Sequence, residues 1–209
     1  HRRLRPEEFA GDALPWRVQP EVAGGGLFVD LAPHTLDFLD AVLGPISAAR
    51  GFASNQGYCY PAEDIVTGSF VFASGVQGVG SWCFTAFDDR DRSEIVGTEG
   101  SLSFPTFGDD PVELINAEGR TEIRLDHPPH IQQPLIQTVV DELLGRGTCP
   151  STGESAARTS WVMDRLLGQS GSNLDSSPSL LLPPGDSLPI MGDAPARGGR
   201  VAAGKLFHK

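Results

Sequence analysis

The sequence predicts an α+β domain: an open, mostly antiparallel sheet of about six strands with helices on one face. Two observations carry this prediction. Short segments of alternating apolar and polar residues, separated by turns, run from residue 45 to residue 125. Segments with helical apolar spacing lie before and after them, at 27–43 and 134–167. The connections between strands are short, which favours antiparallel pairing because parallel strands need a long crossover.

The first helix is predicted at Leu27 to Leu43, between a glycine triplet and Gly44, a common helix-ending residue. The triplet Gly24-Gly25-Gly26 lets the backbone come close to another group. Pro33 fits best in a first helical turn. A regular helix that begins near Leu31, with Asp30 as its N-cap, is therefore the alternative.

Strands are expected next, at 45–55, 64–74, 76–87, 93–96, 101–104, 112–116 and 121–125. The charged residues 88–91 between them suggest a solvated turn. Two amphipathic helices follow, at Pro134–Leu144 and Glu154–Leu167, and both are expected to cover one face of the sheet. Leu135, Val139, Leu143 and Leu144 of the first should point inward. Residues 1–168 form the predicted domain, and the Ser-, Pro- and Gly-rich residues 169–209 are predicted to be a disordered tail.

Composition excludes several classes of function. A net charge of −11 argues against nucleic acid and against an anionic membrane surface, since both favour basic patches. No apolar run approaches the roughly 18 residues that a membrane span needs. The three cysteines are far apart and fit neither a disulfide framework nor a zinc site, so we expect reduced thiols in a cytoplasmic protein. His127-Pro-Pro-His130 is not expected to bind a metal, because the prolines keep the two rings apart.

One stripe of the first predicted helix carries candidate chemistry. Asp30, His34 and Asp37 lie three and four residues apart, and a carboxylate one turn from an imidazole can act as an acid–base pair. A capping role for Asp30 is compatible with this pair. Arg17 either supplies donors to hydroxyls in a cleft or stacks on Trp16 at the surface. His130 is a further candidate to reach the cleft.

An ordered set of motifs resembles the second domain of the glucose–fructose oxidoreductase / inositol 2-dehydrogenase / MocA (Gfo/Idh/MocA) family over about residues 10–168. The motifs are Leu14-Pro15-Trp16-Arg17, Gly24-Gly25-Gly26, Asp30-x-x-x-His34-x-x-Asp37, Leu43-Gly44-Pro45, Gly97-Thr98-Glu99-Gly100-Ser101-Leu102 and Gly153-Glu154-x-Ala156. The resemblance implies the fold of dihydrodipicolinate-reductase-like C-terminal domains.

The resemblance also implies an activity. Family members join a Rossmann domain that binds NAD or NADP to a second domain that contacts substrate and forms the oligomer interface. Asp30 and His34 match the family's D-x-x-x-H motif. His34 would take a hydroxyl proton from a sugar, polyol or cyclic alcohol while Asp30 holds the imidazole. Arg17, Asp37 and His130 are the implied substrate contacts, and homo-oligomerisation would use the uncovered sheet face.

The cofactor domain itself is expected to be absent from these 209 residues, because no Gly-x-Gly-x-x-Gly follows a strand. The chain alone is therefore expected to be inactive as a dehydrogenase. The alternative is a different class of function, a non-catalytic dimerisation or scaffold module derived from the same family.

Overall fold

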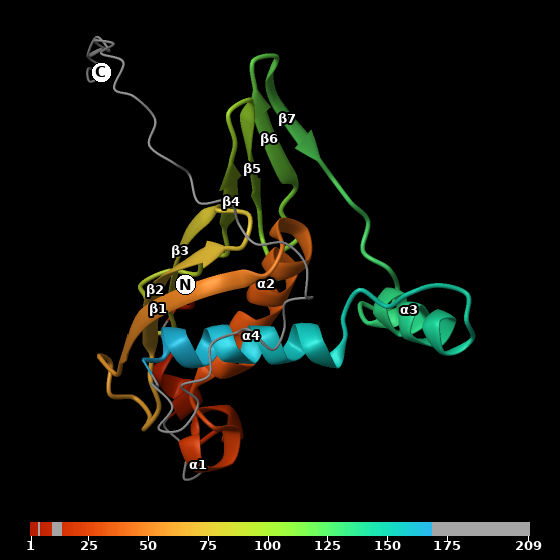
Figure 1. The fold of residues 1–209 in the computed structure, drawn as a ribbon. Helices are drawn as coiled ribbons and strands as arrows, with labels where there is room; N and C mark the ends of the chain where they lie inside the picture. The colour runs from red at the N-terminus through yellow and green to blue at the C-terminus, as the bar shows by residue number, and fades with distance from the viewer. Residues whose placement is uncertain (4, 10–13, 169–209) are drawn as a thin grey trace, which may run out of the picture. The chain divides into compact units, whose positions relative to one another are not determined.

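A computed structural model of the chain describes residues 1–3, 5–9 and 14–168 (Figure 1). The tail predicted at 169–209 lies outside the described residues. Two short 3₁₀ turns, Pro6–Phe9 and Trp16–Val18, and the one-turn helix α1 (Pro20–Ala23) precede the first long helix. None of the helices in the described part of the chain combines the length and the apolar character that a membrane crossing requires.

Helix α2 spans Leu27–Leu43, so the start predicted at Leu27 is correct and the alternative start near Leu31 is wrong. Pro33 lies inside the helix. Proline removes a helical hydrogen bond, but a buried apolar face holds the helix together on both sides of it. That face consists of Leu27, Phe28, Ala32 and Leu36.

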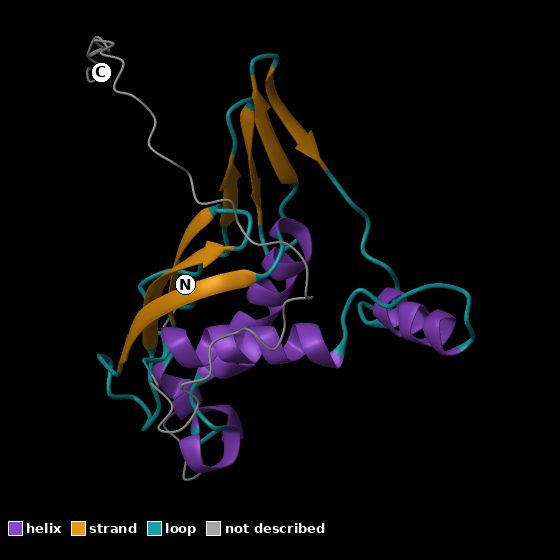
Figure 2. Cartoon of the chain, viewed as in Figure 1, coloured by secondary structure: helices purple, strands orange, loops and turns teal. Residues whose placement is uncertain are grey.

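Within the described residues, seven strands form two antiparallel sheets (Figure 2). The first has the order β1-β2-β3, and the second has the order β4-β5-β6-β7. The strands are β1 (Ile46–Ser54), β2 (Ile65–Phe72), β3 (Gln77–Cys83), β4 (Ser93–Val96), β5 (Gly100–Phe104), β6 (Val112–Asn116) and β7 (Gly119–Ile123). The predicted α+β class with antiparallel strands is confirmed, whereas the strands are hydrogen-bonded in two groups rather than in one sheet.

The N-terminal residues explain this division. Arg2 donates its backbone N–H to the carbonyl of Cys83 at 2.7 Å and accepts one from Ala86 at 3.1 Å. Arg3 and Ala86 form a parallel bridge. The segment that follows β3 is therefore paired with the start of the chain, and β4 begins only after the charged residues 88–91.

The core lies where α2 and α4 (Gly153–Leu166) pack on the first sheet. Phe28, Phe72 and Leu166 are among its largest fully buried side chains. Gly51 of β1 touches the backbone of α4 at Leu166, and a side chain at this glycine would overlap it. Thr152 caps α4 in a capping box with Ser155.

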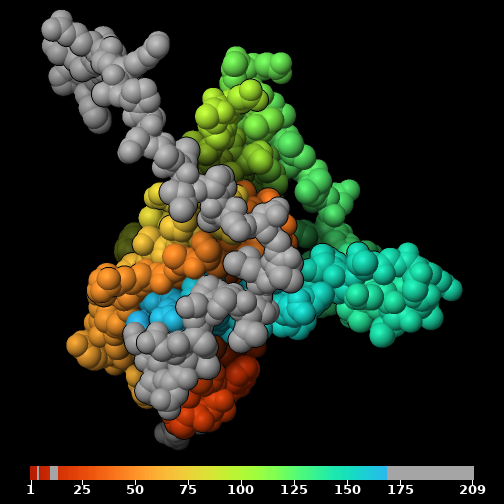
Figure 3. Space-filling model, in the orientation of Figure 1, coloured from red at the N-terminus to blue at the C-terminus, as the bar shows by residue number. Residues whose placement is uncertain are grey.

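Helix α3 (Gln133–Leu143) differs from its prediction. None of its residues is buried, and the surface of the helix is seen in turquoise in Figure 3. The four leucine and valine side chains expected to point inward are exposed to solvent. Periodicity predicted an amphipathic helix correctly but cannot say whether a partner covers the apolar face. Of the two helices expected to cover a sheet, only α4 does so within the described residues.

Candidate functional site

The glycine triplet packs against the loop that precedes β2. Gly26 donates its N–H to Glu63 Oε1 at 2.8 Å, and a side chain at Gly26 would lie 2.5 Å from the Glu63 carbonyl oxygen. Gly24 adopts φ +80°, which favours glycine. A carboxylate thus already occupies the N-terminus of α2. This end of the helix does not fit the phosphates of a dinucleotide, because an anion there would meet Glu63.

Asp30 forms an ion pair with Arg17. Arg17 Nε lies 2.8 Å from Asp30 Oδ2, and the guanidinium sits 4.7 Å from the centre of the Trp16 ring. Both side chains are partly exposed. The two alternatives for Arg17 therefore coexist: it stacks on Trp16 and it presents donors beside a carboxylate. No described residue bonds Asp30 Oδ1, which leaves that oxygen open to a further donor.

His34 lies one helical turn after Asp30 and is exposed. Its ring meets Phe107 edge to face, with centroids 5.4 Å apart and an interplanar angle of 80°. Within the described residues no hydrogen bond joins Asp30 to His34. Helical spacing places the two side chains on the same side of α2, but the structure does not bring them into contact.

The loop between β5 and β6 brings Phe107 to the helix, and no local pattern of residues predicted this contact. Asp91 accepts the N–H groups of Phe107 and Gly108, at 2.5 and 3.2 Å. The hydroxyls of Thr35 and Thr106 lie 3.0 Å apart. Asp91 belongs to the charged turn that was expected only to be solvated, so one member of that turn has a structural role.

The other two candidates point elsewhere. Asp37 accepts a hydrogen bond from the Thr159 hydroxyl at 3.3 Å, which ties it to α4. His130 is exposed in the turn before α3. In the part of the chain that the structure describes, no hydrogen bond or ion pair connects the His130 side chain to Arg17, Asp30 or His34.

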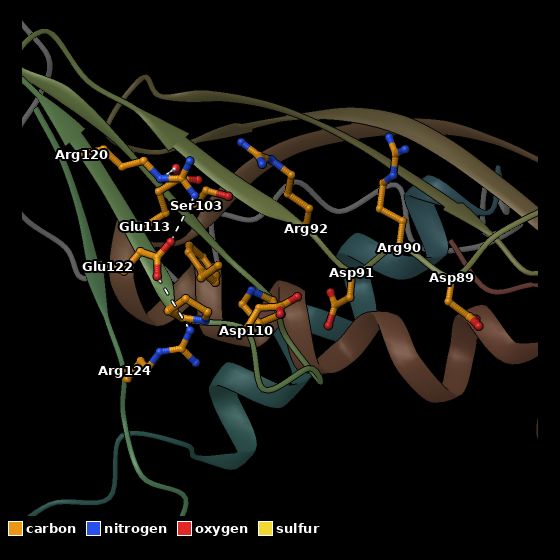
Figure 4. A pocket seen from close by; sticks show the side chains of 13 residues that line it. Asp89, Arg90, Asp91, Arg92, Ser103, Asp110, Glu113, Arg120, Glu122 and Arg124 are labelled. Carbon is orange, nitrogen blue, oxygen red and sulfur yellow. Dashed lines mark hydrogen bonds and ion pairs between the residues drawn. The ribbon is translucent and has the colours of Figure 1, made fainter.

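Two open cavities lie near the sheets. One, of about 790 Å³, is lined by residues 89–92 and by one face of β5–β7, and it is strongly charged (Figure 4). Its arginines and carboxylates largely satisfy one another: Arg120 pairs with Glu113 at 2.5 Å and with Glu122 at 3.3 Å. Asp89 at its rim accepts the Arg3 N–H, which lowers the pKa of this carboxyl. None of the predicted site residues lines this cavity.

The second cavity, of about 1070 Å³, runs beside the candidate stripe of α2. Leu31 and Thr35 of α2 line it together with Phe107. Leu31 and Thr35 directly follow Asp30 and His34 in the chain, and Phe107 contacts the His34 ring. Arg17, Asp30 and His34 themselves are not among the residues that line this groove. Among the described residues, no three histidine, cysteine or acidic side chains gather as a metal site would require.

Comparisons with known proteins bear on this arrangement. Residues 1–103 match the family model of the GFO/IDH/MocA C-terminal domain. Oxidoreductase P35 of Formosa agariphila is 32% identical over 161 residues, which cover 77% of this chain and 49% of that protein. The 1,5-anhydro-D-fructose reductase of Ensifer adhaerens is 32% identical over 145 residues, covering 66% and 43%. The chain spans about half the length of the curated relatives it matches.

Solved structures share the fold. A levoglucosan dehydrogenase in complex with NADH and levoglucosan has a TM-score of 0.65 at 19% identity, over 79% of this chain and 53% of that one. The aldose-aldose oxidoreductase of Caulobacter crescentus, complexed with glycerol, has a TM-score of 0.64 at 16% identity, over 75% and 48%. The resemblance seen in the motifs is confirmed by the matching family model, which identifies residues 1–103 as a C-terminal domain of the GFO/IDH/MocA type.

Proposed function

We propose that the chain forms the substrate side of a nicotinamide-dependent oxidoreductase that acts on a sugar, a polyol or a cyclic alcohol. The observation that carries the proposal is the open array of Arg17, Asp30 and His34 beside a large groove. The named relatives support the substrate class, because they include an anhydrofructose reductase and a levoglucosan dehydrogenase.

His34 is the proposed acid–base group. Its ring is exposed, so a ring nitrogen can accept the proton of a substrate hydroxyl during oxidation and return it during reduction. Bound NAD or NADP would supply the acceptor for the hydride that leaves the same carbon. Asp30 lies one turn before His34 on the same side of α2. Its Oδ1 atom is open to the imidazole or to a substrate hydroxyl.

Arg17 is the proposed substrate contact with the best support. Its ion pair with Asp30 and its contact with Trp16 fix the guanidinium beside the open carboxylate oxygen. The guanidinium presents several N–H donors in a rigid plane, which suits hydroxyls. Asp37 and His130 are also proposed as substrate contacts, although Asp37 must then share its carboxylate with Thr159.

The described residues fit only the reactive end of the cofactor. Exposed imidazole and carboxylate groups suit the site of proton transfer, whereas Glu63 occupies the helix end that would otherwise receive a phosphate. We therefore propose that the phosphates are bound by residues outside this domain. The 209-residue chain alone should then not sustain turnover.

The experiment joins this chain to a nicotinamide-binding domain and measures turnover with NAD and with NADP over a panel of sugars and polyols. We expect turnover that falls about 10²- to 10⁴-fold in His34→Gln. Arg165→Gln is the control, because Arg165 lies on α4, stacks on Trp161 and belongs to none of the proposed contacts. Equal activity of the two variants would reject the catalytic role of His34.

One observation favours a second role, oligomerisation. The strand register puts six apolar side chains of the second sheet on one face, opposite Val96 and Ile115, and none of the six is buried in the described structure. They are Ile95, Leu102, Phe104, Val112, Leu114 and Ile123. We propose that this uncovered face pairs with a second copy of the chain, as uncovered apolar faces often do. If the chain is a non-catalytic scaffold, it keeps the role in oligomerisation and does not act as part of an oxidoreductase.

A further inference from the structure

We propose that Phe107 is a specificity-determining residue whose ring packs against the C–H face of a pyranose substrate, and that Asp91 is the residue that positions it. This inference rests on the proposed function and names the substrate class at the same site. It is carried by the anchoring of the Phe107 loop, by its contact with His34 and by the chemistry of the neighbouring side chains.

The Phe107 loop is held in place without burial of its aromatic ring. Three polar contacts anchor residues 106–109: Asp91 to two backbone N–H groups, Thr106 to Thr35 of α2, and Asp109 to His127 Nε2 at 2.9 Å. The ring itself stays 53% exposed. Large aromatic side chains gain most by burial, so a firmly held and half-open ring keeps apolar surface available for a ligand.

The ring stands at one end of a row of side chains. Phe107 contacts His34, and Asp30 follows one turn before it on α2. Arg17 pairs with Asp30 and lies over the exposed ring of Trp16. Two exposed aromatic rings therefore flank a cation, a carboxylate and an imidazole, and one of these rings, Phe107, also lines the groove.

This row matches the chemistry of a pyranose. Such a ring has hydroxyls around its edge and a face made of C–H groups, so it presents polar and apolar surfaces at right angles. Its hydroxyls suit the donors and acceptors of Arg17, Asp30 and His34, while its C–H face suits an aromatic ring. An acyclic triol has the hydroxyls but no continuous apolar face, and it should gain little from Phe107.

Asp91 acts through the loop rather than on the ligand. Its Oδ2 atom accepts both N–H groups at the turn that carries Phe107. Without this carboxylate the two donors lose their shared acceptor, and the ring is no longer fixed on His34. Asp91→Ala should therefore reproduce the binding defect of Phe107→Ala and should also shift the ring resonances of His34, which report the nearby aromatic ring.

The test measures binding to the 209-residue chain by NMR titration without a cofactor, using methyl β-D-glucopyranoside and glycerol as probes. We expect Phe107→Ala to weaken pyranoside binding about tenfold and glycerol binding by less than about twofold. Phe107→Tyr keeps the ring and should stay within about twofold of the unmodified chain. Phe52→Ala is the matched control, because Phe52 is 76% exposed on the other sheet.

Three results would overturn the proposal: no pyranoside binding by the unmodified chain, equal effects of Phe107→Ala and Phe52→Ala, or an equal loss for both probes. An equal loss for both probes would mean that Phe107→Ala disrupts the loop as a whole and does not remove a stacking contact with the pyranose ring. These outcomes are separate from failure of the proposed function. Binding needs no hydride transfer. Phe107 can therefore set specificity in a protein whose His34→Gln variant still turns over. Conversely, His34 can be catalytic in a protein in which Phe107→Ala leaves pyranoside binding unchanged.

Discussion

At the scale of single residues, Asp40 is a buried carboxylate with an ion-pair partner. Its side chain is 5% exposed, and Arg158 of α4 donates to both carboxylate oxygens, at 2.5 and 3.1 Å. This bond to Asp40 raises the pKa of the Arg158 guanidinium above its ordinary value. The pair joins α2 to α4 and so helps to hold the helix that carries the candidate site.

Arg158→Leu should destabilise the fold, because it leaves Asp40 buried without its partner. We expect the free energy of unfolding in urea to fall by about 3 kcal/mol. Arg165→Leu is the control on the same helix, because Arg165 stacks on the face of the Trp161 ring. This substitution should lower the free energy of unfolding by about 1 kcal/mol or less. Equal losses would show that the buried pair contributes no more than the exposed stacking.

Tyr60 gives a pH-dependent expectation. Its hydroxyl is buried and has no hydrogen-bond partner among the described residues. Burial, with Asp64 and Glu63 nearby, raises the pKa of Tyr60 above its ordinary value of about 10. Above that pH the unfolded chain loses this proton while the folded chain retains it. The free energy of unfolding should therefore fall as the pH rises from about 10 toward the folded pKa.

Tyr60→Phe should remove this alkaline dependence and should be neutral or stabilising at neutral pH, because it deletes a buried polar atom without a partner. Urea unfolding at a series of pH values measures both effects. Tyr58→Phe is the control, because Tyr58 is the other tyrosine of the chain and is 83% exposed. A Tyr60→Phe variant with an unchanged alkaline slope would contradict the argument.

At the scale of elements, the contact between β1 and α4 depends on a glycine. A side chain at Gly51 would overlap backbone atoms of Leu166 and Thr67, which cannot move aside as a flexible side chain can. We expect Gly51→Ala to lower the free energy of unfolding by about 1–3 kcal/mol. Gly153→Ala at the start of α4 has open space around it and should change stability by less than about 1 kcal/mol. The same urea titration compares the two.

Local patterns in the sequence predicted most of these elements. Apolar spacing from Leu27 and the stop at Gly44 placed α2 correctly, and alternation placed the strands, because both signals depend on near neighbours. The division into two sheets depends on Arg2 and Ala86, which are far apart in the chain. Such pairing leaves no periodic signal. The exposed face of α3 was missed for a related reason, since its periodicity does not reveal whether a partner is present.

In the candidate site, too, only the features that depend on near neighbours in the chain could be predicted. The four-residue spacing of Asp30 and His34 was readable as a shared helical stripe. The contacts that surround them were not, because Arg17, Phe107 and Asp91 reach the helix from three other segments. Glu63 at the glycine triplet was also invisible in the sequence. The glycines indicated close approach of another group, but their spacing could not say that the group was a carboxylate.

At the scale of the whole molecule, the uncovered face of the second sheet should control self-association. Leu102 lies on this face, and Ser101 next to it faces the opposite side. We expect the unmodified chain to form an oligomer in sedimentation velocity runs. Leu102→Glu should shift it toward the monomer, because a charge on an apolar interface is costly to bury, whereas Ser101→Glu should not. A monomer at all concentrations would contradict oligomerisation through this face.

The measurement that tests the central claim most directly compares kcat/KM for Asp30→Asn, His34→Gln and the double variant in a protein that contains both this chain and a nicotinamide-binding domain. If the two residues act as one acid–base unit, the double variant should lose about as much activity as His34→Gln alone, since effects within such a unit are not additive. If the losses of the two single variants add, or if His34→Gln keeps the activity of the unmodified protein, the stripe of α2 is not the acid–base site.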